Sequence, residues 1–176
     1  MPKQRFLVCH DYGMGGVWWV ILARSAREIV ETFAETAVVD DPQRWVEVEE
    51  WGLDEVDIDD RSDSSLNSLR ARRDTQRIRP GFGVMADRAL LYTRNRWDPE
   101  EDRAAADYLT EITDGYRTRQ VEILDTGEAT RTDLDDFPLN PPIDLWDPDL
   151  AEQEITAEEF EKAWDSAMPP PEGWYL

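Results

Sequence analysis

The fold is decided by residues 5–35, RFLVCHDYGMGGVWWVILARSAREIVETFAE, where two apolar runs flank a glycine-rich turn and lead into a helix start. The runs at 6–9 and 17–23 are short and rich in β-branched and aromatic side chains, a composition typical of buried strands. Segment 12–16 between them holds three glycines, which tolerate the positive φ angles of a tight turn. We therefore expect a β-hairpin in this part of the chain.

A helix start follows the hairpin directly. Ser25 and Glu28 have the spacing of a capping box, in which each side chain accepts the other residue's free backbone N–H. After this helix, residues 37–39 predict a third strand. Residues 43–51 alternate as in a strand, but Pro42 at a first helical turn favours a helix, which is the interpretation we prefer.

The middle of the chain alternates between polar loops and short elements. Residues 53–65 are crowded with aspartates and serines and predict a solvated loop. Residues 65–79 have the composition of an arginine-rich helix, which Pro80 and Gly81 end. A strand is expected at 89–93.

The clearest hairpin signal lies further on. Residues 108–113 and 116–124 are β-type runs joined by the turn dipeptide Asp114-Gly115, and residues 129–132 predict a third strand beside them. We therefore expect a three-stranded meander.

The last part of the chain completes the expected architecture. Segment 133–149 contains four prolines and predicts an extended surface wrap, and Thr156 with Glu159 repeats the capping-box spacing of a helix start. Together these elements predict a single acidic α+β domain over 1–176, with an antiparallel sheet and two or three capped helices on one face. A sub-boundary is indicated near 97–104, and whether the two halves share one sheet stays open.

Charge and composition exclude several classes of partner. The 176 residues include 40 acidic and 19 basic side chains, which gives a net charge of −21. This charge repels nucleic acid phosphates and anionic lipids, so we expect no nucleic acid and no membrane as a partner. The longest apolar run is far shorter than a membrane span, the sequence shows no leader pattern, and its single cysteine permits no internal disulfide. These features predict a cytoplasmic protein.

The charge is distributed unevenly. Residues 61–103 hold 10 basic and 7 acidic side chains, whereas the segments on either side are strongly acidic. One interpretation is that these arginines pair with acidic neighbours in the same fold, and the other is that they form a recognition surface.

The sequence contains few of the thiol and imidazole side chains that often act as catalytic groups or metal ligands. Cys9 and His10 are the single cysteine and the single histidine, and as strand neighbours they point to opposite faces, which favours neither a catalytic dyad nor a shared metal site. The glycine turn lacks the lysine of a phosphate loop, and the aspartates of 57–63 do not match an EF-hand loop. We predict no catalytic residue, no cofactor and no metal. An alternative is a small enzyme that uses His10.

Two motifs in the C-terminal part carry a resemblance. The first combines YLTEI at 108–112, the Asp-Gly turn and RQVEI at 119–123, and the second is EITAEEFEKAW at 154–164. They are similar to short uncharacterised bacterial proteins in which a hairpin with an R-x-V-E-I-like strand precedes an E-I-S/T-x-E-E-F-E-x-x-W helix. The resemblance covers about 60 of the 176 residues and implies that this chain has the same hairpin and the same helix. It implies no named activity and no functional residue.

These observations favour a protein that acts by binding. A strongly acidic chain suits a basic protein partner, because opposite charges speed the encounter and aromatic anchors slow dissociation. We expect an immunity-type or inhibitor-type protein that occludes a basic partner such as a toxin. The alternative is a structural or scaffold subunit of a larger assembly, and the oligomeric state stays open. The candidate contacts lie in an acidic loop, the wrap and an aromatic tail: Asp54, Asp57, Asp59, Asp60, Asp133, Asp135, Asp136, Asp144, Asp147, Asp149, Trp174 and Tyr175.

Overall fold

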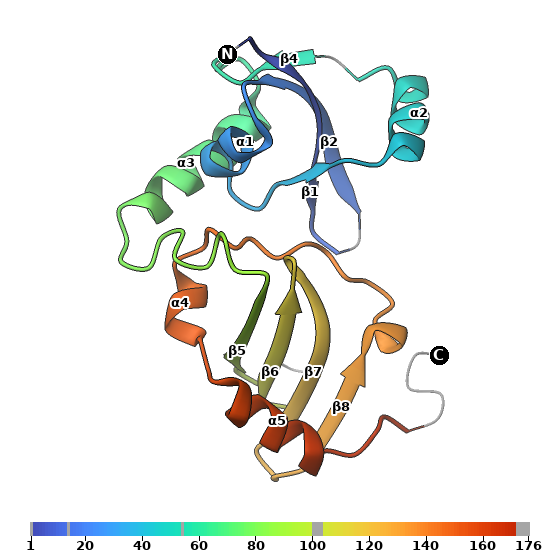
Figure 1. Cartoon of the computed structure of the whole chain (residues 1–176), viewed down its shortest axis with the longest axis vertical. Helices are drawn as coiled ribbons and strands as arrows, with labels where there is room; N and C mark the ends of the chain where they lie inside the picture. Colours follow the sequence, from blue (N-terminus) through green and yellow to red (C-terminus); the bar gives the residue numbers. More distant parts are fainter. Residues whose placement is uncertain (1, 14, 54, 100–103, 172–176) are drawn as a thin grey trace.

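The chain forms two lobes, each built on its own four-stranded sheet (Figure 1). The computed structural model describes residues 2–13, 15–53, 55–99 and 104–171. The first sheet has the strand order β3-β1-β2-β4 and the second the order β5-β6-β7-β8. The α+β class with an antiparallel sheet is therefore confirmed, and the two halves of the chain do not share one sheet.

The first sheet is built around the predicted hairpin. β1 (Gln4–Asp11) and β2 (Gly16–Ala23) pair antiparallel along their whole length, and β3 (Ala37–Val39) pairs antiparallel with β1. β4 (Glu55–Asp57) pairs parallel with β2, inside the segment that the sequence predicts as a solvated loop. That prediction was wrong there, because β4 is held by its backbone pairing to β2, which its acidic composition does not reveal.

Helices cover both faces of the first sheet. α1 (Ala26–Thr32) and α3 (Ser64–Arg77) pack on the face of Val8 and Trp19, whereas α2 (Pro42–Trp51) packs on the opposite face, where Val48 is buried. The helix that we preferred for 43–51 is thus confirmed. No helix within the described ranges combines the length and the apolar character needed to cross a membrane.

The cap of α1 forms only half of the predicted box. The Ser25 hydroxyl accepts the Glu28 N–H at 3.1 Å, as expected. The Glu28 carboxylate, however, accepts hydrogen bonds from the backbone N–H and the guanidinium of Arg24. The neighbouring arginine attracts this carboxylate more strongly than a neutral N–H does, because a charge-assisted hydrogen bond is stronger.

The second sheet is an antiparallel meander. β5 (Leu90–Trp97), β6 (Ala106–Thr113), β7 (Tyr116–Leu124) and β8 (Ala129–Asp133) follow one another in space as in the sequence. α5 (Ala157–Ser166) covers one face through Phe160, and Thr156 with Glu159 forms the full capping box predicted for it. The chain on either side of α5 also covers both edge strands. Ile155 donates to the Tyr92 carbonyl at 2.9 Å, and Met168 donates to the Ala129 carbonyl at 3.0 Å.

The passage between the lobes lies earlier than the indicated sub-boundary. The chain leaves the first lobe at the end of α3 and enters the second at the start of β5. Residues 97–104 instead connect β5 with β6, which are neighbours in one sheet; of these, 100–103 lie outside the described residues. The proline-rich wrap of 133–149 is confirmed as mostly irregular chain. It contains the 3₁₀ turn η1 (Leu134–Asp136), leads into α4 (Asp149–Gln153) and runs along the junction of the lobes (Figure 1).

Candidate functional site

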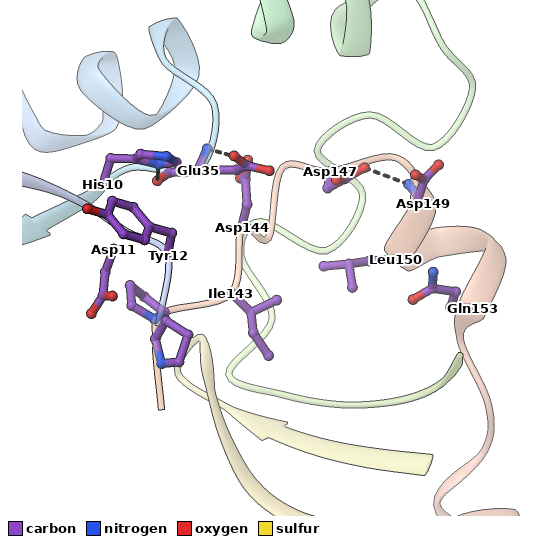
Figure 2. Close-up of a pocket in the computed structure, with 12 residues that line it drawn as sticks. His10, Asp11, Tyr12, Glu35, Ile143, Asp144, Asp147, Asp149, Leu150 and Gln153 are labelled. Carbon is purple, nitrogen blue, oxygen red and sulfur yellow. Dashed lines mark hydrogen bonds between the residues drawn. The ribbon is translucent and has the colours of Figure 1, made fainter. Parts of the chain in front are cut away.

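A cleft of about 470 Å³ lies where the two lobes meet. The tip of the β1–β2 hairpin, with His10 and Tyr12, forms one wall, and α4 with the turn before it forms the opposite wall (Figure 2). Residues 141–144 of the wrap lie between the two walls. The cleft therefore depends on the packing of both lobes and on the path of the wrap.

The hairpin tip is fixed by local hydrogen bonds. The Asp11 carboxylate accepts the Gly13 N–H at 2.8 Å, and the Tyr12 N–H donates to the Gly15 carbonyl at 3.1 Å. Gly13 and Gly15 both have positive φ angles, as the glycine-rich turn predicts. The Tyr12 side chain is 61% exposed, so a large aromatic ring stands at the rim of the cleft.

The wrap is anchored by a buried ion pair. One guanidinium nitrogen of Arg73, Nη2, lies 2.8 Å from both carboxylate oxygens of Asp144, and the two side chains are 0% and 9% exposed. The same carboxylate accepts the backbone N–H of Glu35 at 2.9 Å. Asp144 thus joins α3, the end of α1 and the wrap at the centre of the cleft.

The opposite wall is held by α4 and its preceding turn. The Asp147 carboxylate accepts the Asp149 N–H at 3.0 Å, which closes the turn before the helix. Asp149 forms an ion pair with Arg79 from the segment after α3. Leu150 is buried under the turn and keeps α4 against the second sheet.

The cleft carries an excess of negative charge. Among its described lining residues, five are carboxylates and none is a lysine or arginine. Three of the five pair with arginines outside the lining, as Glu35 does with Arg72 at 2.8 Å. Asp11 and Asp147 form no ion pair with any residue in the described ranges, and both are half-buried. A cation that entered the cleft would therefore meet two carboxylates that form no direct ion pair with another described side chain.

His10 lies in the cleft and is held by the backbone. Its Nδ1 is 2.8 Å from the Glu35 carbonyl, and its ring centroid is 6.0 Å from that of Tyr12. Cys9 is buried on the strand beside it, and loss of solvent raises the pKa of its thiol to about 11. Within the described residues, no three His, Cys, Asp or Glu side chains are grouped to hold a metal ion.

The nine predicted contact residues that the structure describes form three groups. Asp144, Asp147 and Asp149 come together in the cleft. Asp57 and Asp59 both bind Lys3, whose hydrogen bonds lower the pKa of the two carboxyls, and Asp60 binds Ser62. The acids of η1 close their own turn, with Asp133 and Asp136 forming a capping box around Asp135. Asp54, Trp174 and Tyr175 lie outside the described residues.

Six of the nine described arginines of the basic segment form ion pairs within the fold, which supports the interpretation that these arginines pair with acidic neighbours. The shortest ion pair of each of these arginines is Arg72–Glu35, Arg73–Asp144, Arg79–Asp149, Arg88–Glu154, Arg94–Asp107 and Arg96–Asp125. Most of these pairs are exposed and contribute little stability individually. Arg73 is the exception, since it is fully buried.

Sequence reasoning missed several residues that line the cleft, among them Asp11, Tyr12 and Glu35. The position of Asp11 and Tyr12 at the glycine turn was a usable signal, because loop tips on a rigid hairpin often carry binding residues. Glu35 has a positive φ of 54° and no such signal in the sequence. Comparisons with known proteins add nothing to these assignments: no family model, no curated protein and no solved structure matches the chain.

Proposed function

We propose that this chain is a non-enzymatic binding protein that captures a basic protein partner, in the manner of an acidic immunity protein or inhibitor that occludes a toxin. The observation that carries the proposal is the cleft between the lobes, whose described lining holds five carboxylates and no lysine or arginine. The net charge of −21 acts in the same direction over a longer range. Opposite charge accelerates the encounter of two proteins and fixes their orientation.

The walls of the cleft suit a protein partner better than a free ion. Tyr12 is an exposed aromatic side chain at the rim, and tyrosines are enriched among the residues that dominate protein interfaces. Asp11 and Asp147 stand on opposite lobes, so a lysine or arginine side chain inserted between the lobes would have carboxylates on both sides. Such an inserted side chain would bring the partner against the hairpin tip and α4.

The proposal is tested by affinity capture from cells of the native host. The tagged chain should retain a partner with a basic isoelectric point at 50 mM salt and should lose most of it at 500 mM, because salt screens exposed charges. The double variant Asp11→Asn/Asp147→Asn should retain less of that partner. The partner's own activity, once it is identified, should fall when the wild-type chain is added.

A matched control separates the cleft from the general acidity of the chain. Glu49 and Glu50 are exposed on α2, outside the lining of the cleft, so Glu49→Gln/Glu50→Gln removes the same number of charges elsewhere. This control variant should capture the partner as the wild type does. Capture of no basic partner, or equal losses in the two double variants, would overturn the proposal.

A further inference from the structure

The acidic cleft continues into a second hollow, which lies on the second lobe. This hollow, of about 330 Å³, lies on the sheet face away from α5 and shares three lining residues with the cleft, namely Ile143, Leu150 and Gln153. Figure 2 shows Leu150 and Gln153 on the α4 side of the cleft, with Ile143 between the walls. The two hollows together form one groove that runs from the hairpin tip to the second sheet.

Uncharged polar side chains in register form part of the floor of the second hollow, which Trp97, Tyr108 and Ile112 also line. Thr93 on β5 lies opposite Thr110 on β6, which lies opposite Gln120 on β7, so the three side chains form a row across the sheet. Asn95 is exposed two residues further along β5 and therefore lies on the same face. Hydroxyl and amide groups both donate and accept hydrogen bonds. Thr93 is buried, but the partly exposed Thr110 and Gln120 and the exposed Asn95 can offer hydrogen bonds to the N–H and C=O groups of a peptide laid across the floor.

We propose that the groove binds an extended segment of the basic partner, with one arginine or lysine in the acidic cleft and the adjoining uncharged residues across β5, β6 and β7. This inference rests on the proposed function and names the part of the partner that is recognised. The charge of each hollow determines which residue of the partner segment lies in it. The cleft offers Asp11 and Asp147 to a cation, whereas the described lining of the second hollow contains no carboxylate.

The second hollow disfavours another cation. Its described lining includes one charged residue, Arg117, whose guanidinium lies 3.8 Å from the centroid of the Phe137 ring and donates to the Leu139 carbonyl at 3.0 Å. A lysine or arginine of the partner would be repelled there. The segment therefore has a basic residue at one end of the groove and neutral residues at the other.

Strand spacing sets the length of the segment. Neighbouring strands lie about 4.8 Å apart, so three strands span about 10 Å, which an extended chain covers in about three residues. A pentapeptide supplies one basic residue for the cleft and four further residues, which is more than the three that the strands require. Hydroxyl and amide side chains pair equally well with a peptide of either direction, so the probes include both directions.

The probes are acetyl-arginine amide and two capped pentapeptides, Arg-Ala-Thr-Ala-Ser and its reverse sequence, titrated into the ¹⁵N-labelled full chain. Acetyl-arginine amide should shift the NMR signals of His10, Tyr12 and Gln153. At least one pentapeptide should in addition shift the side-chain amide signals of Asn95 and Gln120 and bind at least about threefold more tightly than acetyl-arginine amide, because it gains hydrogen bonds on the sheet.

Two variants locate the binding. Asn95→Lys removes the amide from the floor of the second hollow and puts a longer side chain in its place, so it should weaken the pentapeptide about fivefold through loss of hydrogen bonds, with little effect on acetyl-arginine amide, which binds in the cleft. Thr126→Lys introduces the same side chain at the exposed β7–β8 turn and should change neither affinity.

The outcomes separate this inference from the proposed function. Shifts confined to the cleft with all three probes, or equal affinity of pentapeptides and acetyl-arginine amide, would overturn the extended groove and leave the cation cleft in place. No shift with any probe would overturn the inference, while the captured partner and its salt dependence still test the proposed function independently.

Discussion

Arg73 and Asp144 lie 71 positions apart in the sequence, yet the guanidinium Nη2 and the carboxylate oxygens are 2.8 Å apart. The pair links α3 of the first lobe with the wrap of the second. Each of the four hydrophobic clusters formed by the described residues belongs to a single lobe. The lobes are thus joined at this point by a buried polar contact, and the width of the cleft depends on it. Lobes that share no apolar core move relative to each other more readily.

Asp144→Asn should lower the free energy of unfolding by about 3–5 kcal/mol, because it leaves the buried charge of Arg73 without its counter-ion. Urea denaturation followed by circular dichroism measures the change. Asp87→Asn is the control, since it breaks the exposed pair between Arg27 and Asp87 and should cost less than about 1 kcal/mol. Equal effects of the two substitutions would show that the buried pair does not stabilise the junction.

Gly83→Ala should destabilise the chain more than Gly127→Ala. Both glycines have positive φ angles, 68° and 85°, so each alanine adopts a left-handed conformation that costs about 1–2 kcal/mol. A Cβ on Gly83 would also lie 2.8 Å from the Trp146 ring, whereas a Cβ on Gly127 would meet no atom within 4 Å. The extra overpacking at Gly83 should cost about 1–3 kcal/mol more. Thermal unfolding of the two variants measures the difference, and equal melting temperatures would contradict the close approach of Trp146.

The sequence predicts the elements of this fold better than it predicts the cleft. The β1–β2 hairpin, the α5 capping box and the β6–β7 turn depend on residues that lie within a few positions of one another, so their signals are local. The cleft depends on pairings such as Arg73–Asp144, for which any of 40 acidic side chains is a candidate partner from composition alone. The strand β4 was missed for the same reason, since its partner β2 lies more than thirty residues away.

Cys9 should be nearly inert toward iodoacetamide in the folded protein. Burial raises the pKa of the thiol from 9.0 to about 11, which leaves about a hundredfold less reactive thiolate at pH 8. The reaction should therefore be slow in native buffer and fast in 8 M urea, as measured by mass spectrometry. The folded state favours the protonated thiol, so stability should also fall as the pH rises from about 9 to 11. Cys9→Ala should remove this alkaline loss, and an unchanged loss would assign it to other groups.

Glu111 should make the second lobe sensitive to acid. Its carboxylate accepts hydrogen bonds from Arg119 at 3.0 Å and from Thr118 at 2.7 Å, and the bond from Arg119 is the main cause that holds its pKa below the usual value. The folded state thus favours the charged carboxylate. The stabilisation is fully present above the unfolded pKa of about 4.5 and is lost as the pH falls through the lower pKa of the folded protein.

Glu111→Gln should therefore lower the free energy of unfolding at pH 7 by about 2 kcal/mol, the usual contribution of hydrogen bonds to a charged group. The gap between variant and wild type should narrow as the pH falls from about 4.5 toward 3, because the carboxyl of the unfolded wild type takes up a proton in this range. Glu128→Gln, at the exposed β7–β8 turn, is the control and should match the wild type at both pH values. Urea denaturation at pH 7 and pH 3 measures both gaps. The difference in the free energy of unfolding between Glu111→Gln and the wild type should not stay the same at pH 3. An unchanged difference would mean that the glutamine side chain itself fits poorly at this position, because loss of the carboxylate charge destabilises the protein only where the wild-type carboxyl is ionised.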